Sequence, residues 1–142
     1  MFRNLHHESQ DYPFYPLNPA FKETGAGMWW RKRTRQLREA SGLDDQTFAK
    51  RLMVIEWFPY HSVRFALPKH LCKSQGYSFF LAKQMLEKGL LMVRMRARQR
   101  WVAVDRRLES PSLRNLQCGY ITRGNTDGTL FDRIIRALRA DR

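Results

Sequence analysis

The stretch SQGYSFFLAKQMLEKGLLMVRM, residues 74–95, decides the fold that the sequence predicts. The residues of its first part that follow helical spacing are Tyr77, Phe80, Leu81, Gln84 and Met85. Gly89 stands where a left-handed residue commonly ends a helix. The run LLMVRM, residues 90–95, is short and apolar, as expected of a buried strand. A helix that leads directly into such a run predicts part of a strand–helix–strand unit.

Two other short runs are also predicted to be strands. MVIEWF, residues 53–58, is rich in β-forming residues and stops at Pro59, and LQCGYI, residues 116–121, has the same character. Strands that alternate with helices favour parallel pairing through right-handed crossovers. The sequence therefore predicts an α/β fold, with a small, mostly parallel sheet and flanking helices.

Further helices complete this predicted domain. They are expected at residues 28–40, from the Asp44 cap to about residue 52, at residues 97–108 and at residues 129–140. Residues 1–27 combine closely spaced prolines, which exclude a helix, with aromatic side chains. We expect residues 1–27 to form an arm that packs on a single α/β domain of residues 28–142.

The charge of the chain favours a polyanionic partner. Lys and Arg number 26 against 13 Asp and Glu, for a net charge of +13. Arginine dominates this excess, and guanidinium groups match the geometry of phosphate. Nucleic acid is the expected partner, with DNA preferred over RNA. The alternatives are that the charge only keeps the protein soluble or that it reflects an arginine-rich coding bias.

The cysteines and the hydropathy pattern predict a cytoplasmic protein that does not enter the membrane. Cys72 and Cys118 are isolated, which is typical of reduced thiols, and no apolar run is long enough to span a bilayer. The N-terminus also lacks the apolar segment of a signal peptide.

Three loops that follow the predicted strands supply candidate binding residues, because ligands of parallel sheets bind beyond the strand ends. These loops are residues 59–65, 96–100 and 122–128. The predicted nucleic-acid-binding residues are Tyr60, Arg64, Phe65, Arg96, Arg98, Arg100, Arg123 and Asn125. The arginines would meet phosphates, and the rings of Tyr60 and Phe65 would either stack on bases or pack under the loop.

His61 is the candidate catalytic residue, as a proton donor, because imidazole titrates near neutrality. The alternative is a loop histidine that is bonded to nearby backbone. Glu56, inside a predicted strand, would need a partner, for which Arg94 is one possibility. No histidine or cysteine spacing resembles a zinc site, and no glycine-rich nucleotide motif occurs, so no metal and no cofactor are expected.

The order of these segments resembles the later part of the uracil-DNA glycosylase superfamily. The resemblance is carried by VIEWFPYHS (54–62), SQGYSFFLAKQMLEKGLLMVRMRARQRW (74–101) and CGYITRGNTDGTLFDRII (118–135), over about residues 53–138. The chain is also similar to a bacterial group with a Trp-Trp helix and a Phe-Pro-Tyr-His-Ser loop. The resemblance implies DNA binding and, at most, hydrolysis of an N-glycosidic bond.

Several motifs of that superfamily are missing. The first motif, which supplies the water-activating residue, has no match, and MVIEWF contains no base-reading Asn. ITRGN stands where the family has His-Pro-Ser. Only Tyr60, His61, Arg123 and Asn125 occupy positions of the family's functional loops.

Two other functions remain open at this point. A small interaction module would present the Trp29–Trp30 pair, the aromatic arm and the basic helix 28–40 to an acidic protein partner. A truncated, non-catalytic family member would retain only part of the fold.

Overall fold

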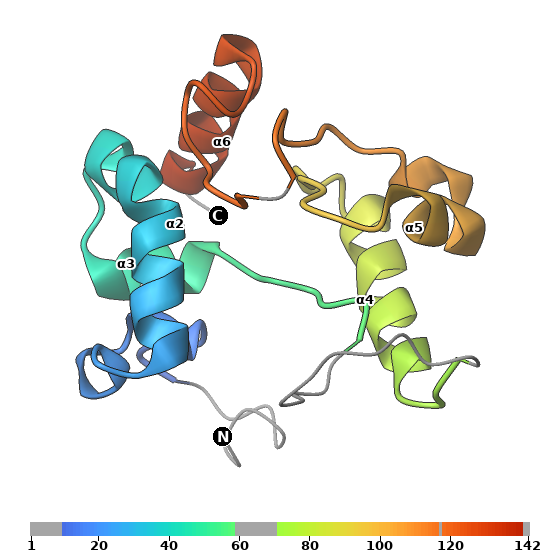
Figure 1. Ribbon diagram of the computed structural model, residues 1–142, viewed down its shortest axis with the longest axis horizontal. Coiled ribbons are helices and arrows are strands. Elements are labelled where there is room, and N and C mark those ends of the chain that lie inside the picture. The colour runs from blue at the N-terminus through green and yellow to red at the C-terminus, as the bar shows by residue number, and fades with distance from the viewer. Residues whose placement is uncertain (1–9, 59–70, 117, 141–142) are drawn as a thin grey trace. The chain divides into compact units, whose positions relative to one another are not determined.

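The computed structural model describes residues 10–58, 71–116 and 118–140 (Figure 1). The chain divides into two compact units. The terminal unit consists of Met1–Val54 together with Leu113–Arg142, and the central unit is Ile55–Ser112.

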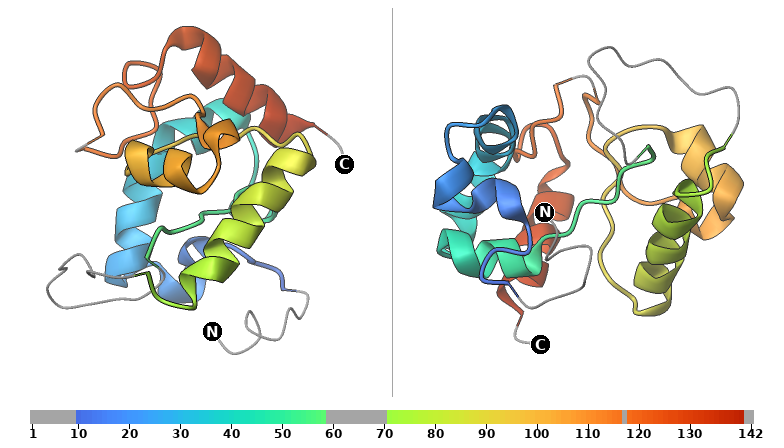
Figure 2. Two further views of the ribbon diagram at one scale, coloured as in Figure 1. Left: turned by 90° about the vertical axis from the view of Figure 1, so that its right-hand side faces the viewer. Right: turned by 90° about the horizontal axis from the view of Figure 1, so that it is seen from below.

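The terminal unit is built from short helical turns and three α-helices. They are η1 (Tyr15–Leu17), η2 (Pro19–Phe21), α2 (Gly25–Ser41), α3 (Asp45–Arg51) and α6 (Gly128–Arg139). The views in Figure 2 show η1 and η2, in blue, lying against α2. The helices of the central unit are α4 (Gln75–Glu87), α5 (Arg98–Val104) and η3 (Arg106–Leu108).

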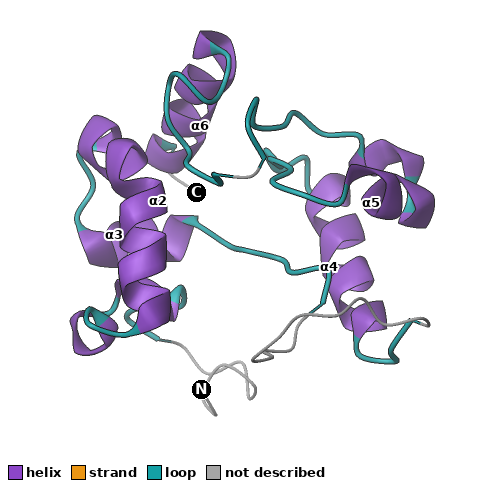
Figure 3. Cartoon of the chain, in the orientation of Figure 1, coloured by secondary structure: helices purple, strands orange, loops and turns teal. Residues whose placement is uncertain are grey.

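The predicted α/β fold is wrong, because the regular structure of the described residues is helical throughout (Figure 3). No strand occurs in residues 10–58, 71–116 or 118–140, where one isolated parallel bridge joins Arg94 and Ser112. The small parallel sheet of the glycosylase-like layout is therefore not present in this part of the chain. Helices joined by loops replace it.

The three predicted strands fail because other partners take their backbone groups. The Trp57 carbonyl accepts a hydrogen bond from the side chain of Gln75 at 2.9 Å, and the N–H of Arg94 donates to the Pro111 carbonyl at 2.8 Å. The Ile121 N–H donates to the carbonyl of Arg33 on α2 at 3.1 Å. A short apolar run pairs as a strand only if neighbouring backbone is offered to it, and these three runs meet side chains and loops.

The predicted helices are confirmed, except that the one expected at residues 97–108 is divided into α5 and η3, and the ends of α2, α3 and α6 follow known capping rules. The prolines of residues 1–27 do not exclude helical turns, because η1 and η2 each begin with a proline in their first turn. The Thr24 side chain accepts from the N–H of Gly27 at the start of α2, and Gly42, with φ of 68°, ends the helix. Asp44 caps α3 as expected, and the Asp127 side chain caps α6. Gly89 follows α4 with φ of 64°, in the predicted left-handed conformation.

The core of the terminal unit joins residues from both parts of the chain. Its buried apolar side chains are Phe14, Leu17, Leu37, Phe48, Ala49, Leu113, Ile121, Leu130, Phe131, Ile134, Ile135 and Leu138. The five that come from α6 are the predicted apolar stripe of the last helix. Arg139 closes this packing by donating to the carbonyls of Ser41 and Ala40 at 2.9 and 2.8 Å.

An aromatic cluster forms the centre of the central unit. The ring of Trp57 lies 5.0 Å from that of Phe79 and 5.1 Å from that of Trp101. Gln75 is completely buried beside them and bonds both the Trp57 carbonyl and the Cys72 N–H. A buried amide with both ends bonded fixes the segment that enters the cluster.

Glu56 and Arg94 do not need each other in this structure. Glu56 is exposed, and Arg94 forms an ion pair with Glu109 at 2.9 Å. The carboxylate of Glu56 therefore keeps contact with water and requires no buried cation.

Asp45 joins three elements of the terminal unit. Its carboxylate accepts from Arg31 at 2.6 Å and from Arg38 at 2.8 Å, which connects α3 to two turns of α2. Arg31 also donates to the carbonyl of Leu17 in η1 at 2.5 Å. Partial burial alone would raise the pKa of Asp45, but the hydrogen bonds and charges of Arg31 and Arg38 hold that pKa below its usual value of 3.8.

The first turn of α2 lies unusually close to the chain that precedes it. A Cβ atom on Gly27 would come within 2.0 Å of the carbonyl oxygen of Phe21, a backbone atom that cannot move alone. Only glycine allows this approach.

Replacing Gly27 with alanine should destabilise the terminal unit by about 1–3 kcal/mol, because the added methyl group forces α2 away from η2. Gly25→Ala is the matched control in the same helix turn, since its Cβ would meet nothing within 4 Å. The control should be neutral or slightly stabilising. Urea denaturation followed by circular dichroism measures the free energy of unfolding of both variants. Equal stability of the two variants would refute the close approach.

Asp45→Asn should lower the free energy of unfolding by about 1–3 kcal/mol at pH 7. The pKa of Asp45 is lowered in the folded state, so its contribution is complete well above 3.8 and is lost as the pH falls below that value. The difference between variant and wild type should therefore shrink on acidification.

The control for this experiment is Glu39→Gln. Glu39 lies 3.9 Å from Arg35, and the two side chains are 67% and 77% exposed, so the change should stay within about 0.5 kcal/mol. A destabilisation by Asp45→Asn that does not depend on pH would contradict the role of the charge.

Candidate nucleic-acid interface

The predicted site residues fall into three groups. Tyr60, His61, Arg64 and Phe65 lie outside the described residues. Arg96, Arg98 and Arg100 belong to the central unit, whereas Arg123 and Asn125 belong to the terminal unit. The reason for grouping them was a shared sheet edge, and the described residues form no sheet.

The arginines of the central unit differ in their partners. Arg98 forms an ion pair with Glu109 at 2.8 Å, which raises the pKa of Arg98 and lowers that of Glu109. Arg96 is exposed and Arg100 is half-buried, and neither meets an acidic side chain within the described ranges. Within the described ranges, the charge of Arg98 is therefore partly balanced, and those of Arg96 and Arg100 are not.

Arg123 is held against α6. It forms an ion pair with Asp132 at 2.5 Å, which lowers the pKa of that carboxyl, and its guanidinium lies 4.9 Å from the ring centre of Phe131. The Arg123 N–H donates to the side chain of Gln36 at 2.6 Å. Asp132 thus pairs with Arg123, and its predicted partner one turn along, Arg136, adds a longer-range charge effect.

Asn125 organises the loop in front of α6. Its Oδ1 accepts from the N–H of Asn115 at 2.6 Å, and its Nδ2 donates to the carbonyls of Tyr120 at 2.7 Å and Asn115 at 3.1 Å. The amide predicted to contact a ligand is therefore used inside the protein. What it does is fix the position of Tyr120.

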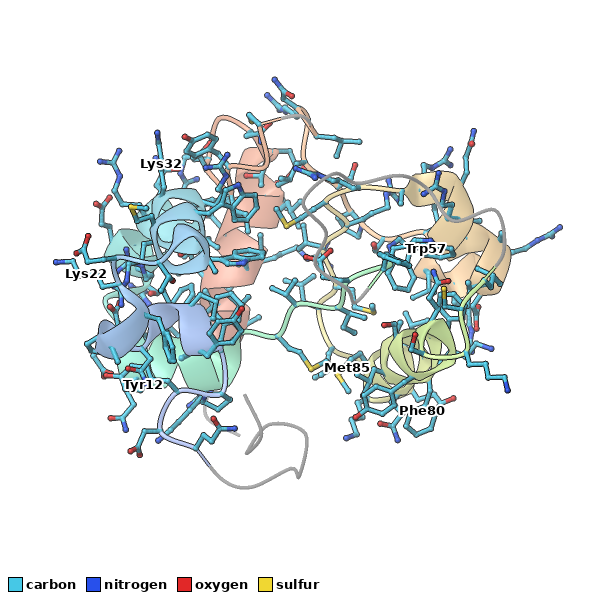
Figure 4. All side chains as sticks on the ribbon, turned by 60° about the horizontal axis from the view of Figure 1, so that its bottom comes forward. Tyr12, Lys22, Lys32, Trp57, Phe80 and Met85 are labelled. Carbon is cyan, nitrogen blue, oxygen red and sulfur yellow. The ribbon has the colours of Figure 1, made fainter. Side chains whose placement is uncertain are left out.

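Tyr120 completes a cluster that the sequence analysis did not find. The Arg33 guanidinium carbon lies 4.3 Å from the ring centre of Trp29 and 4.7 Å from that of Tyr120. The Lys32 ammonium lies 6.0 Å from the Tyr120 ring centre, and Figure 4 shows Lys32 extending outward from α2. Trp29, Lys32, Arg33 and Tyr120 are called the Arg33 surface below.

Arg33 differs from the other arginines of α2. Arg31 and Arg38 are committed to Asp45, and Arg35 approaches Glu39. No acidic partner of Arg33 occurs among the described residues, whereas its buried Nε, which has no hydrogen bond there, is a feature that Arg31 and Arg38 share. The rings of Trp29 and Tyr120 therefore restrict the positions open to the Arg33 guanidinium, which meets no carboxylate in the described part of the chain.

The signal for this surface was partly present in the sequence. Trp29, Lys32, Arg33 and Gln36 recur at intervals of three and four residues and so share one face of α2. Tyr120 lies far away in the chain and was assigned to a strand, so the spacing alone could not bring it to Arg33.

Two other kinds of site are absent from the described residues. No group of three or more His, Cys, Asp or Glu side chains there is arranged to hold a metal ion. None of the described helices combines the length and the apolar character needed to cross a membrane.

Asn125→Ala should lower the free energy of unfolding by about 1–3 kcal/mol, because it leaves the backbone groups of Asn115 and Tyr120 without their amide partner. Thr129→Ala, at an exposed position of α6, is the control and should change stability by less than about 0.5 kcal/mol. Chemical denaturation of the two variants gives the comparison. Wild-type stability in Asn125→Ala would show that the amide does not hold the loop.

Comparisons with protein-family models, with curated proteins and with solved structures found no match to this chain. Among the described residues, the Arg33 surface combines a cation that meets no carboxylate with two rings that lie against it.

Proposed function

We propose that this protein binds nucleic acid and that the Arg33 surface of the terminal unit contacts the phosphate backbone. The observation that carries the proposal is the guanidinium of Arg33, held between Trp29 and Tyr120 without an acidic partner in the described part of the chain. Lys32 adds a second positive charge beside it. DNA is the first ligand to test and RNA the second.

The physical reason is preorganisation. A long arginine side chain loses rotamer freedom when it grips a ligand, and here the two rings restrict it beforehand. The two rings lie 4.3 and 4.7 Å from the guanidinium carbon and Nε is buried, so the terminal Nη groups are the ones that would donate to phosphate oxygens. The rings of Trp29 and Tyr120 do not bond the phosphate themselves, but they hold the guanidinium in position.

Net charge supports the same partner. The whole chain carries +13, and such a field raises the rate at which polyanions are encountered. Paired cations contribute less, because Arg31, Arg38, Arg98 and Arg123 already meet carboxylates. The unbalanced cations are the ones expected to release counterions from a phosphate backbone.

The proposal concerns binding and assigns no reaction. The candidate catalytic residue, His61, lies outside the described residues and contributes no geometry. We also propose that the protein acts in the cytoplasm, where the free thiols of Cys72 and Cys118 would stay reduced.

Arg33→Gln should weaken binding to a labelled DNA oligonucleotide about ten-fold at low salt and reduce the slope of log affinity against log salt by about one. Fluorescence anisotropy across a salt series measures both quantities, with RNA of the same sequence in a parallel series. Arg35→Gln is the matched control, because it removes the same charge from another face of the same helix. It should change affinity less than about two-fold.

Three outcomes decide the proposal. No binding of wild type to DNA or RNA at low salt would refute it. Equal losses in Arg33→Gln and Arg35→Gln would show that net charge, and not the Arg33 surface, is responsible. Polyglutamate that competes as well as DNA would favour an acidic protein partner instead.

A further inference from the structure

The aromatic rings of YSFF, residues 77–80, lie on different sides of α4. Phe79 packs on Trp57 and Trp101 inside the central unit. Tyr77 and Phe80 are 52% and 53% exposed, and their rings stack on each other 6.3 Å apart with an interplanar angle of 25°. Figure 4 shows Phe80 and Trp57 on different sides of α4.

The exposed rings belong to a regular stripe along α4. Tyr77, Phe80 and Gln84 follow one another within α4 at intervals of three and four residues, which places them on one helix face. Lys73 and Lys88 continue this spacing in the turns just before and just after the helix. Both lysines are exposed, and Glu87 is the one acidic residue within α4. These five residues are called the α4 stripe below. It has two rings at its centre and a cation at each end.

We propose that the α4 stripe is a stacking platform for single-stranded nucleic acid. This inference rests on the proposed function and adds the class of ligand. Bases of a single strand would lie on the faces of Tyr77 and Phe80, and phosphates on either side would meet Lys73 and Lys88. Aromatic faces accept any base, so the platform would show little sequence preference.

Single strands suit this surface better than duplexes. Every base in a duplex is covered by its neighbours on both faces, whereas an unpaired strand offers bases to a protein ring. The helix that carries the stripe has 13 residues, which corresponds to about 20 Å. A strand with the stacked rise of about 3.4 Å per nucleotide would place about six nucleotides along it.

The charges argue against a protein that covers the same rings. A second copy of this chain docked by two-fold symmetry would bring its own Lys73 and Lys88 onto the same stripe, and like charges would oppose that contact. Two exposed rings between lysines complement a ligand that carries both π-faces and negative charge. Nucleic acid supplies both within each nucleotide.

The test uses the full chain and three labelled ligands of twelve nucleotides: a single-stranded DNA, the corresponding duplex, and an abasic strand with the same phosphates. Phe80→Leu removes the ring but keeps an apolar side chain, and it should lower affinity for the single strand five-fold or more. Affinity for the abasic strand and for the duplex should change less than two-fold. Phe80→Tyr, which keeps an aromatic ring at this position, should bind the single strand about as tightly as wild type.

Leu71→Ala is the control for loss of exposed apolar surface, because Leu71 is 66% exposed and lies outside the stripe. It should leave all three affinities unchanged. Circular dichroism of each variant confirms that the helices are retained.

The inference is overturned if Phe80→Leu lowers the affinity for all three ligands equally. It is also overturned if wild type binds the ligands and Phe80→Leu lowers none of the three affinities. It is also overturned if Phe80→Leu converts a wild-type dimer into a monomer in sedimentation experiments, since the rings would then serve a second copy. Failure of wild type to bind any of the three DNA ligands or an RNA of the same sequence would refute the proposed function as well. The two failures are therefore distinguishable.

Discussion

The terminal unit depends on a single carboxylate. Asp45 receives hydrogen bonds from Arg31 and Arg38, and Arg31 also reaches the carbonyl of Leu17, so one acidic group connects η1, α2 and α3. Arg31 and Arg38 would otherwise repel each other along α2, and their shared bonds to Asp45 instead hold α3 against α2. Because the inward-facing arginines are neutralised here, α2 can be strongly basic and still pack, with Lys32 and Arg33 left on another face.

Helices were predictable because their signals are local. Apolar spacing in α6, the Asp44 cap and the left-handed Gly89 all act within a few residues, and the structure has each of them. The strands were wrong because a strand is defined by its partner. LLMVRM and MVIEWF are apolar enough to pair, but the buried amide of Gln75 and the loop at Pro111 take their backbone groups instead.

The candidate site was less predictable than the helices. Asn125 was predicted to contact nucleic acid, whereas its amide bonds the backbone of its own loop. The face of α2 with Trp29 and Arg33 was visible in the spacing, but Tyr120 reaches it only through the Ile121 contact to the Arg33 carbonyl. A cluster assembled by residues almost 90 positions apart requires the tertiary fold. The exposure of Tyr77 and Phe80 was not predictable for the same reason. Helical spacing predicts a helix, but it does not show which face of the helix packs against the rest of the protein.

The buried stripe of α6 has a consequence for how the protein is made. Its partners in α2 and α3 emerge from the ribosome long before it, and Arg139 bonds Ser41 across 98 residues of sequence. Until α6 is synthesised, Leu37 and Phe48 lack part of their cover, and exposed apolar surface of this kind attracts chaperones or other nascent chains. The central unit, by contrast, has its whole sequence available earlier. We therefore expect the central unit of the newly made chain to fold before the terminal unit, whose two parts lie at opposite ends of the sequence.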